Sequence, residues 1–173
     1  LLKDLKIKCQ LQGIIFVDSN CLENQTLAYQ PIIEILHKLE PYVESRCSSQ
    51  ILKNLRGIFK DRSKQSSASN ESQISFHQNT VKLLAEISQV IPLVIVIENL
   101  QWADFSTLQF LDHFQKQKDK GKVLVCCSLR EEDLKDNTVL RSLIDQGMKR
   151  EDVGYIKLER FDLPHTRTLI LSK

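Results

Sequence analysis

Hydrophobic residues form two kinds of pattern that alternate along the chain. Helical spacing predicts amphipathic helices, and short apolar runs predict buried strands. Near the start, Leu1, Leu2, Leu5 and Cys9 lie at helical spacing among charged residues. Gly13 is expected to end this helix, and the apolar run Ile14–Val17 then predicts a buried strand. A polar turn is expected from Asp18 to Thr26.

The next stretch of the chain predicts helices separated by prolines. One is expected to begin at Gln30–Pro31, because proline is well tolerated in the first turn of a helix. Pro41 is expected to interrupt it. Weaker helical spacing continues from Ile51 to Phe59, and a further helix around Ile87 is expected to close before Pro92.

Two apolar runs without alternation, Leu93–Ile97 and Val123–Cys127, predict strands that are buried on both faces. A helix carrying Leu108, Leu111 and Phe114 separates them. The C-terminal part predicts a helix capped by Asn137 and closed by Gly147, a last strand at Tyr155–Leu158, and a final helix from Pro164. Alternating strands and helices predict an α/β fold, a parallel sheet with helices on both faces.

The segment from Ser63 to Ser75 is rich in serine, asparagine and glutamine and has almost nothing to bury. We therefore expect a flexible surface loop inside one domain rather than a boundary between two domains.

Composition narrows the class of protein. The 173 residues suffice for one domain, and 42% hydrophobic with 27% charged residues is typical of a globular chain. The net charge of +2 comes without a basic block, so we expect no direct contact with nucleic acid or a membrane. Five cysteines without C-x-x-C spacing indicate reduced thiols and a cytoplasmic protein.

Candidate chemistry lies in the segment Leu93–Leu111. The buried strand runs directly into Glu98, which places a carboxylate at the carboxyl edge of the sheet, where open α/β sheets bind ligands. Magnesium prefers oxygen ligands and keeps several of its waters, so one carboxylate can suffice to hold it. A strand followed by a carboxylate is a weak indication of a metal site, because this pattern is common. The residues that follow Glu98 strengthen it.

The continuation L-Q-W-A-D, before a helix, resembles the STAND/AAA-like P-loop ATPases of large signalling proteins, whose strand runs into D-D-x-x-W-x-D. Other segments resemble the same family in the same order: Leu1–Leu5 the helix after the phosphate-binding loop, Thr26–Leu36 the P-Y-Q-P-L-x-x-L stretch, Val123–Leu134 the fourth strand with its sensor exit, and Phe161–Ile170 the entry to the lid helices.

The resemblance implies that residues 1–173 are a partial ATPase domain, N-terminally truncated after the Walker A loop, with a lid region starting at about 162–173. It implies a strand order of 5-1-4-3-2 with strand 1 missing. The implied function is an ATP-binding switch in a multidomain cytosolic signalling protein, fused to a kinase, cyclase or transcription-regulator module. ATP, ADP and magnesium would bind only with the missing loop, and the partners would be other domains and proteins.

The same resemblance assigns roles to four residues. Glu98 would hold Mg²⁺ through a water. Asn99 falls where the family has its water-polarising acid, and an amide can orient a water but cannot accept its proton. Whether the family's ATP hydrolysis is retained in this protein therefore stays an open question. Ser128 and Arg130 fall in the sensor region and would contact the nucleotide.

Each residue also has a plainer interpretation. Asp104 is expected to be a helix N-cap, and Trp102 to pack against the sheet. Arg130 could equally be a solvated side chain, and Ser128 an ordinary strand-end hydroxyl. Two other functions stay open for the chain: a catalytically inactive scaffold for protein–protein interaction, which Asn99 favours, and a flavodoxin- or receiver-like domain, for which Asp18 is the only acidic support.

Overall fold

The computed structural model describes residues 1–24, 27–63, 70–134, 137–162, 167–168 and 170–171. The chain divides into two compact units, Leu1–Leu143 and Ile144–Lys173. In chain order the elements are α1 (Leu2–Leu11), β1 (Ile15–Asn20), α2 (Gln30–Arg46), α3 (Ser49–Ser63), α4 (Asn70–Val90), β2 (Leu93–Glu98), η1 (Leu100–Trp102), α5 (Phe105–Lys116), β3 (Val123–Cys127), η2 (Glu131–Leu134) and α6 (Thr138–Gly147).

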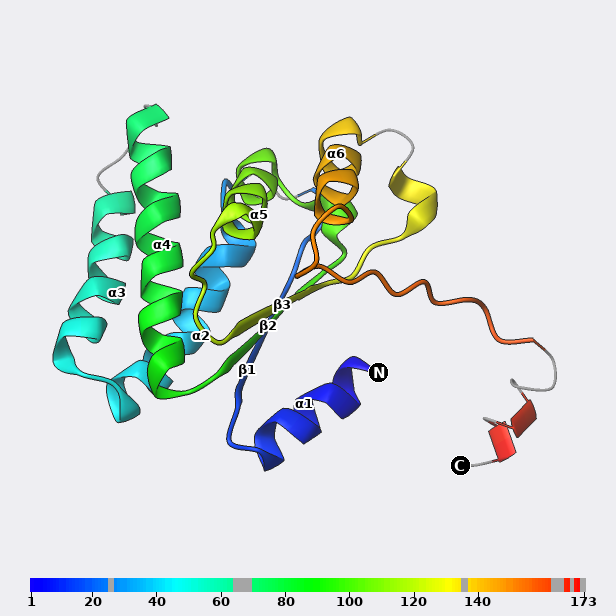
Figure 1. Cartoon of the computed structure of the whole chain (residues 1–173), viewed down its shortest axis with the longest axis horizontal. Helices are drawn as coiled ribbons and strands as arrows, with labels where there is room; N and C mark the ends of the chain where they lie inside the picture. The colour runs from blue at the N-terminus through cyan, green and yellow to red at the C-terminus, as the bar shows by residue number, and fades with distance from the viewer. Residues whose placement is uncertain (25–26, 64–69, 135–136, 163–166, 169, 172–173) are drawn as a thin grey trace. The chain divides into compact units, whose positions relative to one another are not determined.

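The three strands form one parallel sheet in the order β1-β2-β3 (Figure 1). Ile15 pairs with Leu93, and Leu93 pairs with Val123, so the three strands start in line. The central strand β2 is buried over its first five residues because neighbours cover both its edges and both its faces. This order matches the expected neighbours 4-3-2, with β1, β2 and β3 as the second, third and fourth strands.

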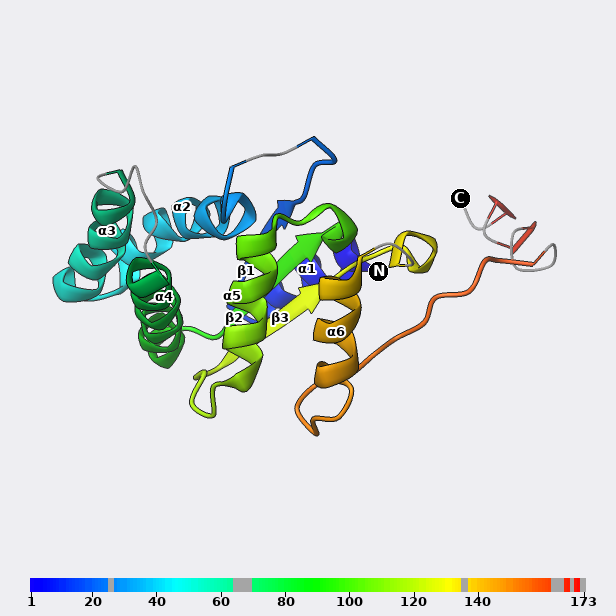
Figure 2. The same ribbon diagram turned by 90° about the horizontal axis from the view of Figure 1, so that it is seen from above.

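Helices cover both faces of the sheet, as the sequence predicts. On one face α1 buries Cys9 against Val94 and Val96, with Leu5 and Phe16 packed around them. The larger helices lie on the opposite face, where α2 and α5 contact one another and α3 packs beside α4 (Figures 1 and 2). Fully buried side chains on this side include Leu36, Leu39, Ile87 and Ile97. The structure confirms the α/β fold class.

Strand β1 is longer than the sequence predicts, since it reaches Asn20 and takes in three residues expected in a turn. Alternate positions of β1 stay partly exposed, so polar residues can occupy them without being buried. The carboxylate of Asp18 lies 3.6 Å from Lys6 Nζ and 3.7 Å from Lys38 Nζ. These lysines come from α1 and α2 and give the aspartate partners within the strand.

The expected interruption at Pro41 is wrong, because α2 continues through it to Arg46. Proline removes one backbone donor from a helix and is costly in the interior. Here Leu39 and Val43, on either side of Pro41, are fully buried, while Pro41 itself is exposed. Burial of the flanking residues therefore holds the helix together across the proline.

The loop expected at residues 63–75 is wrong at both ends, where the structure has helix. Ser63 is the last residue of α3, and α4 begins at Asn70, so residues 70–75 are helical. Residues 64–69 lie outside the described residues. The polar residues 70–75 form a helix because α4 is long, and only the later part of it has to bury side chains such as Leu83 and Ile87.

The strand expected at Tyr155–Leu158 is wrong: these residues have no regular secondary structure. Ile156 and Leu158 are 78% and 73% exposed. A strand needs a neighbour to satisfy its backbone, and apolar residues alone do not supply one. The final helix expected from Pro164, like most of the lid region at 162–173, falls on or beside residues that the structure does not describe.

Candidate functional site

The carboxyl ends of the three strands meet at one edge of the sheet. Backbone hydrogen bonds tie β2 to β3 there: Ser128 N–H donates to Ile97 O at 3.0 Å, and Leu100 N–H donates to Ser128 O at 2.8 Å. The Ser128 hydroxyl oxygen also accepts from Asn99 N–H at 3.3 Å. Glu98, Asn99 and Ser128, predicted separately from the sequence, are therefore held together.

Asn99 joins the ends of β1 and β2 through its side chain. Its Nδ2 donates to Oδ1 of Asn20 at 2.8 Å. Its backbone is left-handed, with φ 56°, a conformation that asparagine tolerates better than most residues. With Nδ2 engaged, Oδ1 of Asn99 has no hydrogen-bond partner among the described residues and can accept a hydrogen bond from a water.

Glu98 ends β2 opposite Asn20 and is half-buried. Among the described residues, no hydrogen bond or ion pair reaches its carboxylate. A half-buried carboxylate without a protein partner favours a cationic ligand. The geometry therefore leaves Glu98 available for a metal-bound water.

Arg130, just beyond β3, lies beside η1. Its guanidinium is exposed and lies over the Trp102 ring, 5.4 Å from the centroid, a cation–π contact. Its backbone N–H donates to the side-chain Oε1 of Gln101 at 3.3 Å. The Gln101 side chain is buried, and its Nε2 has no partner among the described residues. The arrangement fixes the backbone of Arg130 and leaves its charge near the sheet edge.

Asp104 is the N-cap of α5, which confirms the plainer interpretation. Its carboxylate accepts from the backbone N–H of Thr107 at 2.9 Å and from the Thr107 hydroxyl at 2.5 Å. It also accepts from the Tyr29 backbone N–H at 3.1 Å, which ties the start of α2 to the start of α5. Three donors occupy this carboxylate, so it is a poor metal ligand.

The described residues give little support for a reactive thiol, a cluster of metal ligands or a receiver-like acidic site. Burial, then the charges of Asp104 and Glu34, raise the pKa of the Cys21 thiol to about 12, so it stays protonated at neutral pH. No group of three metal-ligating side chains occurs in the described ranges. Asp18 pairs with lysines rather than with other acids, which removes the support for a receiver-like acidic cluster.

Two residues of this edge were missed in the sequence. Asn20 was expected in a turn, and only the pairing of β1 with β2 places it opposite Glu98. Gln101 is polar and lies within the L-Q-W-A-D segment, but nothing in its type signals that it is buried. The predicted strand ended at Val17, three residues before Asn20, so its end gave no signal for Asn20.

The comparisons with known proteins give one match. The family model described as AAA ATPase domain matches residues 1–126, which contain the whole of β1 and β2 together with Glu98 and Asn99. Ser128 and Arg130 lie just beyond the matched residues. No curated protein and no solved structure matches the chain at a significant level. No helix in the described residues is long and apolar enough to cross a membrane.

Proposed function

Because the chain belongs to the AAA ATPase domain family, we propose that it forms the core of an ATP-binding switch domain in a multidomain cytosolic signalling protein of the STAND type. The observation that carries the proposal is the shared edge of the sheet, where Glu98, Asn99 and Ser128 are held together by the ends of β2 and β3. In open α/β sheets, ligands bind outside this edge.

The proposed roles follow from the free atoms at this edge. Glu98 would hold Mg²⁺ through a water, and the ion would neutralise phosphate charge. Asn99 would orient a water through its Oδ1. Arg130 would turn from the Trp102 ring towards the nucleotide, since no carboxylate in the described part of the chain holds its guanidinium. The change in the position of Arg130 on nucleotide binding would regulate kinase, cyclase or transcription modules of the same protein.

The phosphate-binding part of such a site is not in these residues. None of the five glycines stands in the spacing G-x-x-G-x-G-K-[ST]. We therefore expect these 173 residues alone to bind ATP weakly or not at all. Submicromolar ATP binding by this chain in calorimetry would show that the nucleotide lies elsewhere than at the proposed edge.

The test of the proposed function is Glu98→Gln in the full-length protein. The amide cannot attract a magnesium-bound water as a carboxylate does, so magnesium-dependent ATP affinity should fall by about tenfold or more, a loss of about 1.4 kcal/mol. Isothermal calorimetry with and without magnesium measures it.

Asp104→Asn is the matched control, because asparagine caps a helix about as well as aspartate. Its ATP affinity should change much less than that of Glu98→Gln. Equal losses in the two variants would mean that the carboxylates are wrongly assigned.

A second function, a nucleotide-free scaffold for protein–protein interaction, is favoured by one observation. The water-polarising position carries an amide already engaged with Asn20. Full-length protein that binds no ATP at millimolar concentration would support this alternative.

A further inference from the structure

Aromatic and imidazole rings gather where α4, α5 and the start of α2 meet. This ring cluster consists of Tyr29, Phe76, His77, Phe110, His113 and Phe114. His77 is at its centre and only 7% exposed. Its ring centroid lies 5.8 Å from that of Phe110 and 5.4 Å from that of His113. Two imidazoles thus face one another across the α4–α5 contact.

A buried hydrogen bond joins the cluster to α2. The Tyr29 hydroxyl and His77 Nε2 lie 2.9 Å apart. When Nε2 carries no proton, it accepts from the hydroxyl, and the neutral ring keeps its proton on Nδ1. A proton added at Nε2 removes that acceptor. The Tyr29 hydroxyl then has to rotate, and the imidazolium has to stay charged in an apolar surrounding.

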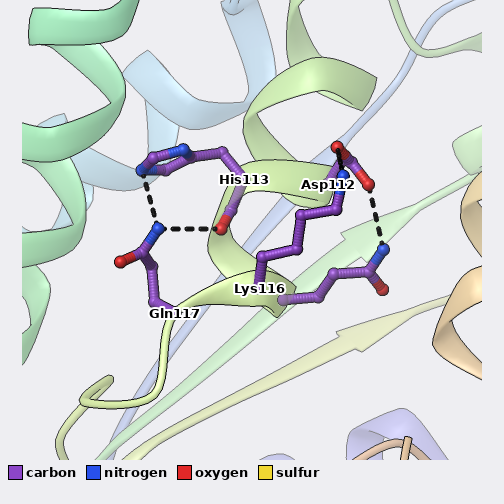
Figure 3. A network of polar contacts seen from close by, with 5 residues as sticks. Asp112, His113, Lys116 and Gln117 are labelled. Atoms are coloured by element: carbon purple, nitrogen blue, oxygen red, sulfur yellow. Dashed lines mark hydrogen bonds and ion pairs between the residues drawn. The ribbon is translucent and has the colours of Figure 1, made fainter.

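The cluster offers no counter-charge for such a proton. No ion pair joins either imidazole to a carboxylate in the described part of the chain. From α5, His113 is hydrogen-bonded to Gln117, whereas the charged residues Asp112 and Lys116 of the same helix pair with each other at 2.6 Å, away from His113 (Figure 3). From α2 the facing group is the Tyr29 hydroxyl. Within the described residues, the hydrogen-bond and ring contacts of His77 are with Tyr29, Phe76, Phe110 and His113, so no charged side chain of α3 or β3 is among them.

Tyr29 connects the ring cluster to the sheet edge, because it contacts both His77 and Asp104. It is the N-cap residue of α2, with a left-handed backbone at φ 59°. Its backbone N–H donates to the carboxylate of Asp104, which in turn caps α5. A change at His77 therefore reaches the start of two helices through one residue.

We propose that His77, His113 and Tyr29 form a pH-sensitive latch, which holds the start of α2 against α4 and α5 at neutral pH and opens when His77 is protonated. The latch would regulate the position of α2 beside the sheet edge. It does not depend on nucleotide binding.

The surroundings of His77 decide whether the closed latch gains or loses stability as the pH falls. Burial, then the charge of His113, lower the pKa of His77 from its ordinary value of 6.5. The open form has the ordinary pKa and takes up the proton first as the pH falls. The closed latch is therefore fully favoured above pH ~6.5 and loses stability below it, by up to about tenfold in its equilibrium constant per pH unit for one proton.

Hydrogen–deuterium exchange of the full-length protein tests the latch. Exchange of the peptides covering residues 27–36 is compared at about pH 5.5 and about pH 7.5, after correction for the intrinsic rate. Protection of these peptides should fall at the lower pH, towards the tenfold-per-unit limit. In His77→Gln the protection should vary little with pH, because glutamine still offers a hydrogen-bonding group but does not titrate.

Two further variants keep the result interpretable if His77→Gln folds poorly. His113→Gln keeps the Tyr29–His77 bond and removes the imidazole that helps to lower the pKa of His77, so opening should move to lower pH. His37→Gln is the matched control, because His37 is exposed and stacks on Phe59 outside the cluster. It should retain the wild-type pH response. An equal response in the wild type, His77→Gln and His113→Gln would overturn the proposal.

Discussion

Asn99→Asp in the full-length protein is expected to raise the rate of ATP hydrolysis by about 10²-fold or more. A carboxylate can accept the proton of the attacking water, which the native amide cannot, and general-base catalysis contributes about 10²–10⁴-fold. The left-handed backbone at Asn99 also suits aspartate. Asn20 can turn its amide and donate to the new carboxylate, so the contact between β1 and β2 survives.

The measurement is steady-state phosphate release at saturating magnesium and ATP. Asn79→Asp is the control, because it makes the same chemical change at an exposed position on α4, and it should leave turnover unchanged. If Asn99→Asp binds ATP and yet hydrolyses it no faster than the native protein, residue 99 is not the water-activating position. The scaffold function would then gain support.

Gly121→Ala is expected to cost about 2–4 kcal/mol of folding free energy, from a left-handed backbone penalty of about 1–2 kcal/mol and the loss of buried hydrogen bonds. Gly121 has φ +65°, and an added Cβ would overlap the Ser88 hydroxyl and lie 3.1 Å from Ala85 Cα and O. Ser88 is fully buried and bridges two elements: its hydroxyl donates to Ala85 O at 2.8 Å and accepts from Lys122 N–H at 2.9 Å.

Urea unfolding compares this variant with Gly57→Ala. Gly57 lies inside α3, and nothing would meet an added Cβ within 4 Å. Alanine there should stabilise the protein by about 0.5–1 kcal/mol, because glycine is a poor helix former. The two substitutions therefore have opposite expected signs. A Gly121→Ala protein as stable as the native one would mean that the turn before β3 is not held against α4.

The sequence predicts elements that depend on local composition and misses contacts that depend on register. The run Leu93–Ile97 is recognisable because a strand covered on all sides must be apolar, and β2 begins at Leu93 as expected. The Asn20–Asn99 hydrogen bond could not be predicted, since it joins residues 79 positions apart. The apolar residues Tyr155–Leu158 show the opposite failure, because composition alone does not supply a neighbouring strand.

The same limit applies to the candidate site. Glu98 was identified because it ends a recognisable strand, Asn99 because of the family resemblance, and Asp104 because it precedes a helix. Gln101 and Tyr29 were not identified, because their contacts with Arg130 and Asp104 arise only after the chain has folded. Pro41 was misinterpreted because local preference was overridden by the burial of Leu39 and Val43.

Strand β3 pairs with β2 along one side only in the described sheet. Its Leu124 is 54% exposed. A strand side with free backbone donors and acceptors next to an apolar side chain can recruit any extended segment that reaches it. These 173 residues in isolation should therefore become turbid as their concentration is raised. Loss of soluble material on storage would follow from this edge of the sheet, even where every helix remains folded.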